Sequence, residues 1–188
     1  LSHSKESKGQ KELTNINHLL KEYTTLTIKN FNQKHPTLNI HVETVYDPYV
    51  QKINIVSQDI GRALMNILDN AFYSVSRQME LAGQKFNPTI LITSKQLTEG
   101  VEIKIRDNGI GISVENRARI FHPFFTTKPT GTGTGLGLSI AYDIIVHEHG
   151  GKIQFSSEEG IFTEFTIILP NKPEKSFPFE SIITSSQK

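Results

Sequence analysis

The chain has 188 residues, 36% of them hydrophobic and 21% charged, and its 20 Lys and Arg nearly balance its 19 Asp and Glu. A formal charge of +1 excludes a global field that would attract nucleic acid or an acidic membrane, so any anion site has to be local. The sequence lacks cysteine, a signal peptide and any apolar run near the ~20 residues that cross a bilayer, which excludes disulfides and thiolate metal sites and predicts a cytoplasmic location.

The N-terminal part of the chain is predicted to contain a linker, a helix and two short strands. Residues 1–12 are polar and have no apolar period, which is typical of a linker or a frayed helix end. Asn15 is a suitable N-cap, and apolar residues then recur near the helical period at Ile16, Leu19, Leu20, Tyr23, Leu26 and Phe31. Alternation in residues 40–45 and 53–55 indicates two short strands.

A longer helix and a pair of strands follow. The spacing predicts a helix of about twenty residues that starts near Asp59 and has an apolar face of Ile60, Ala63, Leu64, Ile67, Leu68 and Ala71. Residues 83–88 break this pattern. The alternating residues 90–92 and 101–105 predict two strands that turn near Glu99.

The C-terminal part continues with a glycine-rich segment, a helix over residues 136–148, a His-Gly-Gly turn and two strands that end at Pro170. Strands separated by helices without regular alternation favour an α+β fold, in which a two-layer sandwich packs helices on one face of a mixed β-sheet. We therefore divide the chain into a linker or helix end (1–13), one domain (14–170) and a C-terminal tail or linker (171–188).

Three separated motifs are candidates for chemistry: NILDN at 66–70, DNGIG at 107–111 and GTGTGLGL at 131–138. The first two each have an ordinary structural explanation, because paired asparagines occur on solvated helix faces and Asp-Asn-Gly forms turns. Four alternating glycines are harder to explain in this way, since ordering each one costs ~0.5–1 kcal/mol of backbone entropy.

The glycine run matches neither of two common phosphate-binding loops. It follows residues 124–129, which are no buried strand, and this argues against a dinucleotide-binding fingerprint. A Walker-type loop is excluded because no Gly-Lys-Ser/Thr follows at the required spacing. The remaining interpretation is a mobile glycine lid that leads into a helix N-terminus, where free N–H groups favour a phosphate.

Taken in order, the three motifs resemble the N, G1 and G2 boxes of the catalytic domain of bacterial sensor histidine kinases, and IFHPFFTTK at 120–128 resembles their F box. The resemblance extends over residues 16–170 and implies the Bergerat-type ATP-binding fold. The same superfamily holds DNA gyrase, a heat-shock chaperone and a mismatch-repair protein. The resemblance therefore implies nucleotide binding more directly than it implies one reaction.

Carried over position by position, the resemblance implies an ATP site formed by Asn66, Asn70, Tyr73, Asp107, Gly109, Gly111, Ile112, Phe121, Lys128, Gly133, Gly135, Leu136, Gly137, Leu138 and Thr163. In this site Asp107 would accept a hydrogen bond from the adenine amine, and Gly109 and Gly111 would let the backbone approach the base. Asn70 would hold Mg²⁺ through its amide oxygen, supported by Asn66.

The phosphate end of the implied site departs from the family pattern. Tyr73 stands where many members carry a basic residue, which leaves the anion to Lys128, to Arg77 or to Mg²⁺. Lys128 is either a phosphate ligand or a solvated charge of the lid. Phe162 stands where a glycine is frequent, just before the threonine that the family aims at the base.

The resemblance implies transfer of the γ-phosphoryl group of Mg-ATP to a histidine. In the superfamily's ATP hydrolases a glutamate activates water at the position of Asn66, and an amide cannot accept that proton. None of the seven histidines lies in the phosphoacceptor pattern, so we expect the acceptor on an upstream dimerisation domain.

The expected partners follow from that assignment. They are the dimerisation domain, which would make the parent protein a homodimer with or without a membrane anchor, and a response regulator, but no nucleic acid. The fragment alone is expected to be a monomer that binds nucleotide without autophosphorylation. The alternative is a conformational switch that binds ATP without phosphotransfer.

Overall fold

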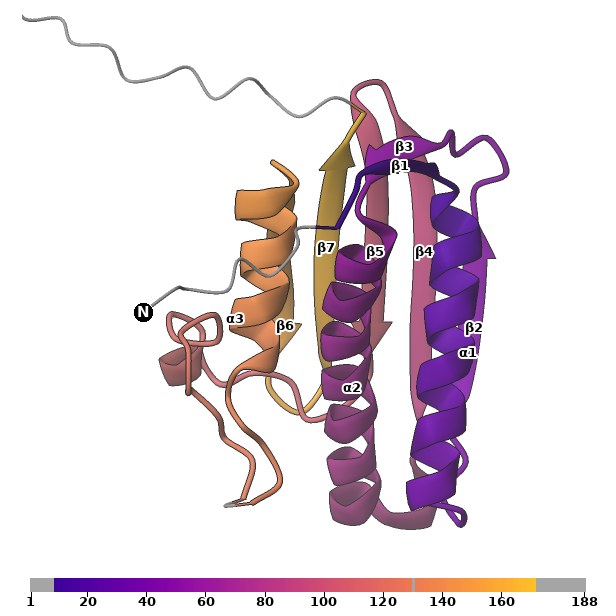
Figure 1. Ribbon diagram of the computed structural model, residues 1–188. Coiled ribbons are helices and arrows are strands. Elements are labelled where there is room, and N and C mark those ends of the chain that lie inside the picture. Colours follow the sequence, from indigo (N-terminus) through magenta and orange to yellow (C-terminus); the bar gives the residue numbers. More distant parts are fainter. Residues whose placement is uncertain (1–8, 130, 172–188) are drawn as a thin grey trace, which may run out of the picture.

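The computed structural model describes residues 9–129 and 131–171, which form two layers (Figure 1). One layer is a five-stranded sheet in the order β2-β4-β5-β7-β6. Its strands are His41–Tyr46 (β2), Thr89–Leu97 (β4), Gly100–Asp107 (β5), Lys152–Glu158 (β6) and Phe162–Pro170 (β7). The strands β2 and β4 run parallel and all other neighbours run antiparallel, which confirms the predicted mixed sheet.

The second layer consists of helices on one face of that sheet, as Figure 1 shows for α1 (Ile16–Lys34), α2 (Ser57–Ala82) and α3 (Gly137–Tyr142). The predicted apolar face of α2 is buried in full, and the helix continues to 26 residues rather than about twenty. Its side chains pack against buried isoleucines of β4 and β5. The predicted α+β sandwich is confirmed, and hydrophobic burial between the layers stabilises it.

The first helix begins as predicted, but one residue of its apolar face was assigned wrongly. The Asn15 side chain caps α1 by accepting a hydrogen bond from the His18 N–H at 3.1 Å. Leu26, predicted to face the core, is 41% exposed, whereas Thr27 is buried. The Thr27 hydroxyl donates to the Tyr23 carbonyl at 2.8 Å, so its polar group is satisfied inside the helix and the threonine can face the core.

A small two-stranded sheet joins the start of the described chain to the segment before α2. Glu12–Thr14 (β1) pairs antiparallel with Ile53–Ile55 (β3). Residues 12 and 13, which were expected to belong to a linker, therefore form a strand, because a distant partner supplies hydrogen bonds that local periodicity does not reveal. Residues 9–11 of that linker form no helix or strand, and residues 1–8 and the predicted tail from residue 172 onward lie outside the described residues.

Short helical segments complete the fold. Two 3₁₀ turns cover Gly83–Lys85 and Val114–Asn116, and α3 continues as a π-helix over Asp143–Glu148 instead of the single α-helix predicted for 136–148. The buried His149 ring follows: its Nδ1 lies 2.7 Å from the Ile144 carbonyl, and its Nε2 accepts from the Val56 N–H at 3.1 Å. This histidine thus ties the end of the π-helix to the start of α2.

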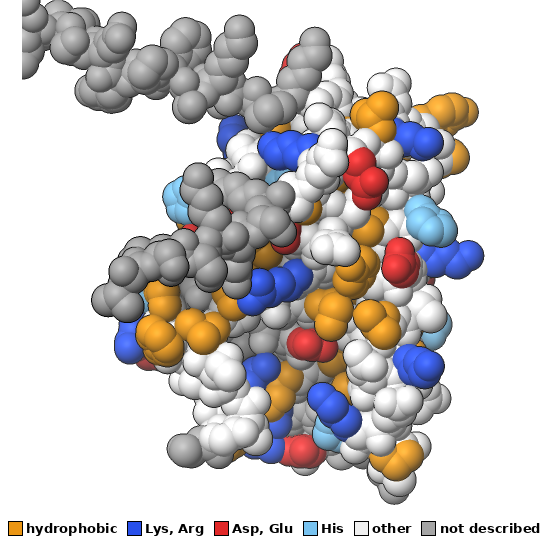
Figure 2. Space-filling model, in the orientation of Figure 1, with side chains coloured by type: hydrophobic (Ala, Val, Ile, Leu, Met, Phe, Trp, Pro, Cys, Tyr) orange, Lys and Arg blue, Asp and Glu red, His pale blue; other side chains and the backbone are white. Residues whose placement is uncertain are grey.

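Charges of both signs are interspersed on the face of the molecule shown in Figure 2, in agreement with the near-neutral composition. Within residues 9–129 and 131–171, none of the helices combines the length and the apolar character that a bilayer crossing requires.

Candidate functional site

A cavity of about 830 Å³ lies between α2, the end of β5 and the loop that precedes α3. We call residues 131–137 of that loop the glycine loop. The cavity is lined by twelve of the fifteen residues implied as an ATP site: Asn66, Asn70, Tyr73, Asp107, Gly111, Ile112, Lys128, Gly133, Gly135, Gly137, Leu138 and Thr163. Motifs more than 60 residues apart in sequence therefore meet at one site.

One end of the cavity is built around Asp107, the last residue of β5. Its carboxylate is only 3% exposed and accepts hydrogen bonds from the Ser74 hydroxyl at 2.8 Å and the Gly109 N–H at 2.9 Å. Burial raises the pKa of Asp107 to about 6, although these two hydrogen bonds and the charge of Arg106 oppose the shift. The group is a buried acceptor aimed at the cavity from a rigid strand.

Hydroxyl groups continue this end of the cavity on the neighbouring strands. Thr163 of β7 is the register partner of Asp107, and its Oγ1 lies 3.1 Å from Ser157 Oγ on β6. Ser157 also accepts a hydrogen bond from the Ile112 N–H at 2.8 Å, which fixes the loop that follows β5. Ser157 holds the wall of the site together without itself lining the cavity.

Each of the two glycines of the DNGIG motif is required at its position for a different structural reason. Gly111 has φ of +68°, and a Cβ there would lie 2.3 Å from the Glu158 carbonyl oxygen. At Gly109 a Cβ would lie 2.1 Å from Ser74 Oγ on α2. Gly109 therefore lets the loop after β5 pack on α2. It was expected to let the backbone approach the base, but it lies outside the cavity lining.

A second group of polar side chains, which we call the Asn70 end of the cavity, lies on α2 one turn before Ser74. Asn66 and Asn70 lie one turn apart on this helix, and the Asn70 amide oxygen accepts a hydrogen bond from Lys128 Nζ at 2.9 Å. The Lys128 ammonium also lies 4.5 Å from the centre of the Tyr73 ring. Asn66 Nδ2 is buried without a hydrogen-bond partner among the described residues, so it is a donor available to a ligand.

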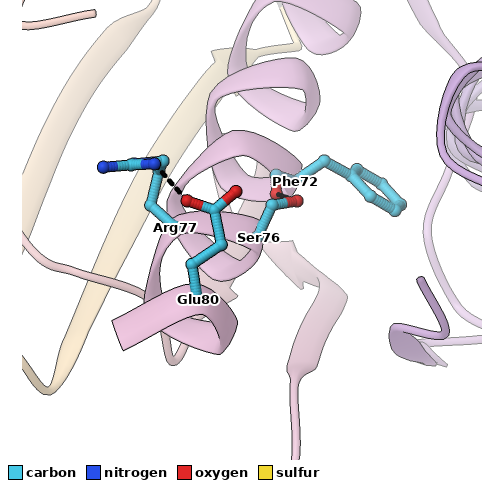
Figure 3. A network of polar contacts seen from close by, with 4 residues as sticks. All are labelled: Phe72, Ser76, Arg77 and Glu80. Atoms are coloured by element: carbon cyan, nitrogen blue, oxygen red, sulfur yellow. Dashed lines mark hydrogen bonds and ion pairs between the residues drawn. The ribbon is translucent and has the colours of Figure 1, made fainter. Parts of the chain in front are cut away.

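Two cationic candidates differ in their availability. Burial lowers the pKa of Lys128, and the charge of Asp69 partly opposes that effect. Arg77, the other cation considered for phosphate, also lines the cavity, but its guanidinium forms an ion pair with Glu80 (Figure 3). Figure 3 also shows that Ser76, on the same turn, is directed elsewhere and donates to the Phe72 carbonyl. Lys128 is therefore the better placed of the two for an anion in the cavity.

The glycine loop closes the cavity on the side of α3. Gly135 has φ of +68°, and a Cβ there would lie 2.5 Å from the backbone of Phe124. At Gly137 a Cβ would come within 3.6 Å of the Asn66 amide. Of the implied site residues here, Leu136 does not line the cavity. Phe121 lies behind the cavity wall, in an aromatic cluster with Tyr142, Phe155 and Phe165.

The side chains present suit a metal ion that a ligand brings with it. Among the described residues, no three His, Cys, Asp or Glu side chains gather as a metal cage. Magnesium binds through few protein oxygens together with water and phosphate oxygens, and Asn70 Oδ1 offers one such oxygen. Asn70 lines the cavity and its oxygen accepts a hydrogen bond from Lys128, so the donor set fits Mg²⁺ only in company with phosphate.

Sequence reasoning missed several side chains that line the cavity, and two of them act on residues that it did predict. Ser74 donates to Asp107, and Asp69 lines the cavity beside Lys128. Ser74 lies four residues after Asn70 on the same predicted helix face, so helical spacing contained the signal for it. Asp69 lies inside the NILDN motif, but sequence alone does not show that a lysine 59 positions later lies near it.

Comparisons with known proteins show the family to which the chain belongs. Residues 55–173 match the family model described as histidine kinase-, DNA gyrase B- and HSP90-like ATPase, which covers more than half of the chain. The signal transduction histidine-protein kinase AtoS of Escherichia coli (strain K12) is 34% identical over 128 residues, which is 68% of this chain and 19% of that protein. Sporulation kinase E of Bacillus subtilis (strain 168) is 34% identical over 145 residues, or 77% of this chain and 18% of that protein.

A similar solved structure is the catalytic domain of the histidine kinase ThkA, with 32% identity and a TM-score of 0.71 over 88% of this chain and 98% of that one. ThkA in complex with the response regulator protein TrrA also matches, with 30% identity and a TM-score of 0.68 over 88% of this chain and 43% of that one. The chain spans only about a fifth of the length of the two curated relatives named above.

Proposed function

The chain belongs to the family of histidine kinase-, DNA gyrase B- and HSP90-like ATPases, and we propose that it serves as the ATP-binding catalytic domain of a sensor histidine kinase. The observation that carries this proposal is that Asp107, Asn70 and the glycine loop line one and the same cavity. A cavity with a buried carboxylate at one end and amide groups with an ammonium at the other suits a molecule that is neutral at one end and anionic at the other.

At the Asp107 end, the ligand is proposed to be an adenine. An ionised carboxylate only accepts hydrogen bonds, and the exocyclic amine of adenine is a donor. A guanine would present a carbonyl oxygen at the corresponding place and leave the carboxylate unpaired, which is costly at a buried site. Thr163 and the backbone around Gly111 then form the sides of the base pocket.

At the Asn70 end, the residues are proposed to hold the triphosphate of Mg-ATP. Lys128 supplies a positive charge, Asn66 Nδ2 supplies a free donor, and Asn70 Oδ1 supplies the oxygen for Mg²⁺. The bound Mg²⁺ would neutralise phosphate charge during transfer. The glycine loop would lie over the phosphates and exclude water from them.

The proposed reaction is transfer of the γ-phosphoryl group to a histidine outside the described residues. Hydrolysis by the glutamate route is disfavoured because Asn66 cannot take a proton from water. The chain's own contribution is then positioning and charge neutralisation, which are the main sources of catalysis in phosphoryl transfer. In this proposal residues 14–170 are the catalytic domain, an upstream dimerisation domain carries the acceptor, and a response regulator receives the phosphoryl group.

The test uses the parent protein that carries the dimerisation helices. Incubation with γ-labelled ATP and Mg²⁺ should give an acid-labile, base-stable phosphate, and an Asn70→Ala variant should give none. Calorimetry on this chain should show Mg²⁺-dependent binding of a nonhydrolysable ATP analogue that Asn70→Ala abolishes. Binding without any labelling would replace phosphotransfer with the switch function, and unchanged affinity in Asn70→Ala would show that the metal oxygen is misassigned.

A further inference from the structure

Three side chains at the phosphate end form a contact that the proposed binding of Mg-ATP does not require. Lys128 Nζ lies 2.9 Å from the Asn70 amide oxygen and 4.5 Å from the centre of the Tyr73 ring. Asn70 and Tyr73 lie three residues apart on α2, so both face the same side of the helix. Lys128 reaches them from the segment before the glycine loop, and its ammonium is held between an oxygen and an aromatic face.

The stem of Lys128 is enclosed as well as its charge. A Cβ at Gly133 would lie 3.0 Å from Lys128 Cδ and 3.1 Å from Lys128 Cβ, so the glycine loop passes directly over the lysine. The position of this loop is thereby linked to the position of the ammonium. Where the lysine is held, the loop has a fixed surface on which to rest.

The Lys128 ammonium is partly buried, so each contact with a neighbouring side chain contributes to holding it in place. Lys128 is partly removed from water, and Asp69 is the nearest opposing charge. The Tyr73 ring offers the negative face of its quadrupole, which attracts a cation more strongly where water is excluded. Asn70 contributes the one side-chain oxygen that accepts a hydrogen bond from Lys128 among the described residues.

We propose that Tyr73 is a positioning residue that holds Lys128 on the Asn70 amide oxygen in the nucleotide-free domain, so that this oxygen stays occupied by an ammonium until a metal nucleotide replaces it. The inference rests on the proposed function only in naming Mg-ATP as the ligand that displaces the ammonium. An ammonium and a metal ion on the same amide oxygen would repel each other at contact distance, so the Lys128 contact and a metal ion at Asn70 compete. Tyr73 then keeps the released ammonium beside the phosphates.

The inference explains why an aromatic residue is useful at position 73. A second basic residue there would repel Lys128, whereas a ring attracts it without competing for the phosphate. The phenolic hydroxyl is not needed for this role, because the ring face makes the contact. Tyr73→Phe should therefore preserve the contact and Tyr73→Leu should remove it, which provides a matched pair of variants.

The experiment measures backbone amide hydrogen exchange across residues 131–135 in the full chain, without nucleotide or metal, and above all that of Thr132, whose N–H donates to the Pro129 carbonyl at 3.0 Å. Tyr73→Leu should raise the exchange rate of this segment about fivefold, as expected for loss of a ~1 kcal/mol cation–π contact, while Tyr73→Phe should match the wild type. Lys128→Met and Asn70→Ala should each raise the exchange rate. The double variant should exchange only slightly faster than the faster single variant, because both substitutions remove the same hydrogen bond.

Equal exchange in the Phe and Leu variants would overturn the role of the ring, and additive effects of the Asn70 and Lys128 variants would overturn the shared bond. Exchange of the amides of β5 serves as the folding control, since it should be the same in all variants. Because these measurements need no ligand, they remain decisive if the wild-type chain fails to bind Mg-ATP, a result that would instead count against the proposed function.

Discussion

The two ends of the cavity are built on different principles. At Asp107 the polar groups are satisfied before any ligand arrives, through Ser74 and the Gly109 N–H, and the residue is fixed in the register of β5 and β7. At the Asn70 end, Asn66 Nδ2 has no partner among the described residues, and the Asn70 oxygen accepts a hydrogen bond from a lysine in a loop. Under the proposed function, base recognition would then be preformed, whereas phosphate binding would rearrange existing contacts.

The glycines of the two ends offer the largest test of that comparison. Gly111 combines φ of +68° with a backbone oxygen that would lie 2.3 Å from an added Cβ, and Gly133 has no unusual φ and faces only side-chain atoms at 2.9 Å and beyond. Gly111→Ala should lower the free energy of unfolding by about 3 to 5 kcal/mol, and Gly133→Ala by less than about 1 kcal/mol. Denaturant unfolding of both variants measures the contrast.

The outcome that would break the comparison is an equal loss of stability in the two variants. Such a result would mean that the glycine loop is packed as tightly as the turn after β5. Gly83→Ala supplies a control, because Gly83 also has a positive φ, +70°, but no atom lies within 4 Å of a Cβ there. The loss of stability in Gly83→Ala measures the backbone strain of a positive φ alone, so the additional loss in Gly111→Ala measures the clash.

Sequence periodicity predicted the elements that carry the site better than it predicted how they are held. The alternating residues of β4 and β5 and the apolar stripe of α2 were sufficient to place Asn70 on a helix and Asp107 at a strand end. The strand β1 was missed because its partner β3 lies some 40 residues away. Leu26 was assigned to the core because periodicity ranks leucine above threonine, although Thr27 can satisfy its own hydroxyl within the helix.

The same limit applies inside the site. Family resemblance identified residues that line the cavity, because their motifs carry the chemistry. It did not reveal that Lys128 bonds Asn70, since that contact depends on where the loop before α3 lies relative to α2. Long-range side-chain contacts of this kind have no local sequence signal, and the presence of Tyr73 becomes meaningful only with the lysine in view.

The pKa of Asp107 gives the second test, because it measures how far the Asp107 end of the cavity is shielded from water. Burial raises this pKa from 3.8 to about 6, so the folded state favours the protonated carboxyl. Ionising this buried carboxyl therefore costs folding free energy. The cost is absent at pH values below the unfolded pKa, grows as pH rises and reaches its full size at pH values above the folded pKa of about 6. Relative to Asp107→Asn, the wild type should lose about 2 kcal/mol of unfolding free energy between about pH 4 and pH 7.

Unfolding curves of both proteins over this pH range provide the measurement. The asparagine keeps an oxygen for Ser74 and the Gly109 N–H, so its own stability should lack this contribution to the pH dependence. A constant difference between the two proteins across the range would show that Asp107 is hydrated in solution. ATP affinity of the wild type should fall as pH drops below about 6, because the acceptor for the adenine amine becomes protonated.

Ser74 gives the smallest and sharpest test of a preformed base end. Its hydroxyl donates to Asp107 at 2.8 Å and lowers the pKa of that carboxyl, so Ser74→Ala should raise the pKa further. A hydrogen bond to a charged group contributes about 1.5 kcal/mol, which corresponds to roughly tenfold weaker ATP binding at neutral pH when the carboxylate is less well held. Ser76→Ala, two residues along α2, removes a hydroxyl that only bonds the Phe72 carbonyl and should leave affinity unchanged. If calorimetry shows equal affinities for the two variants, Asp107 is held by its strand and Gly109 alone, and the base end is even more rigid than its hydrogen bonds suggest.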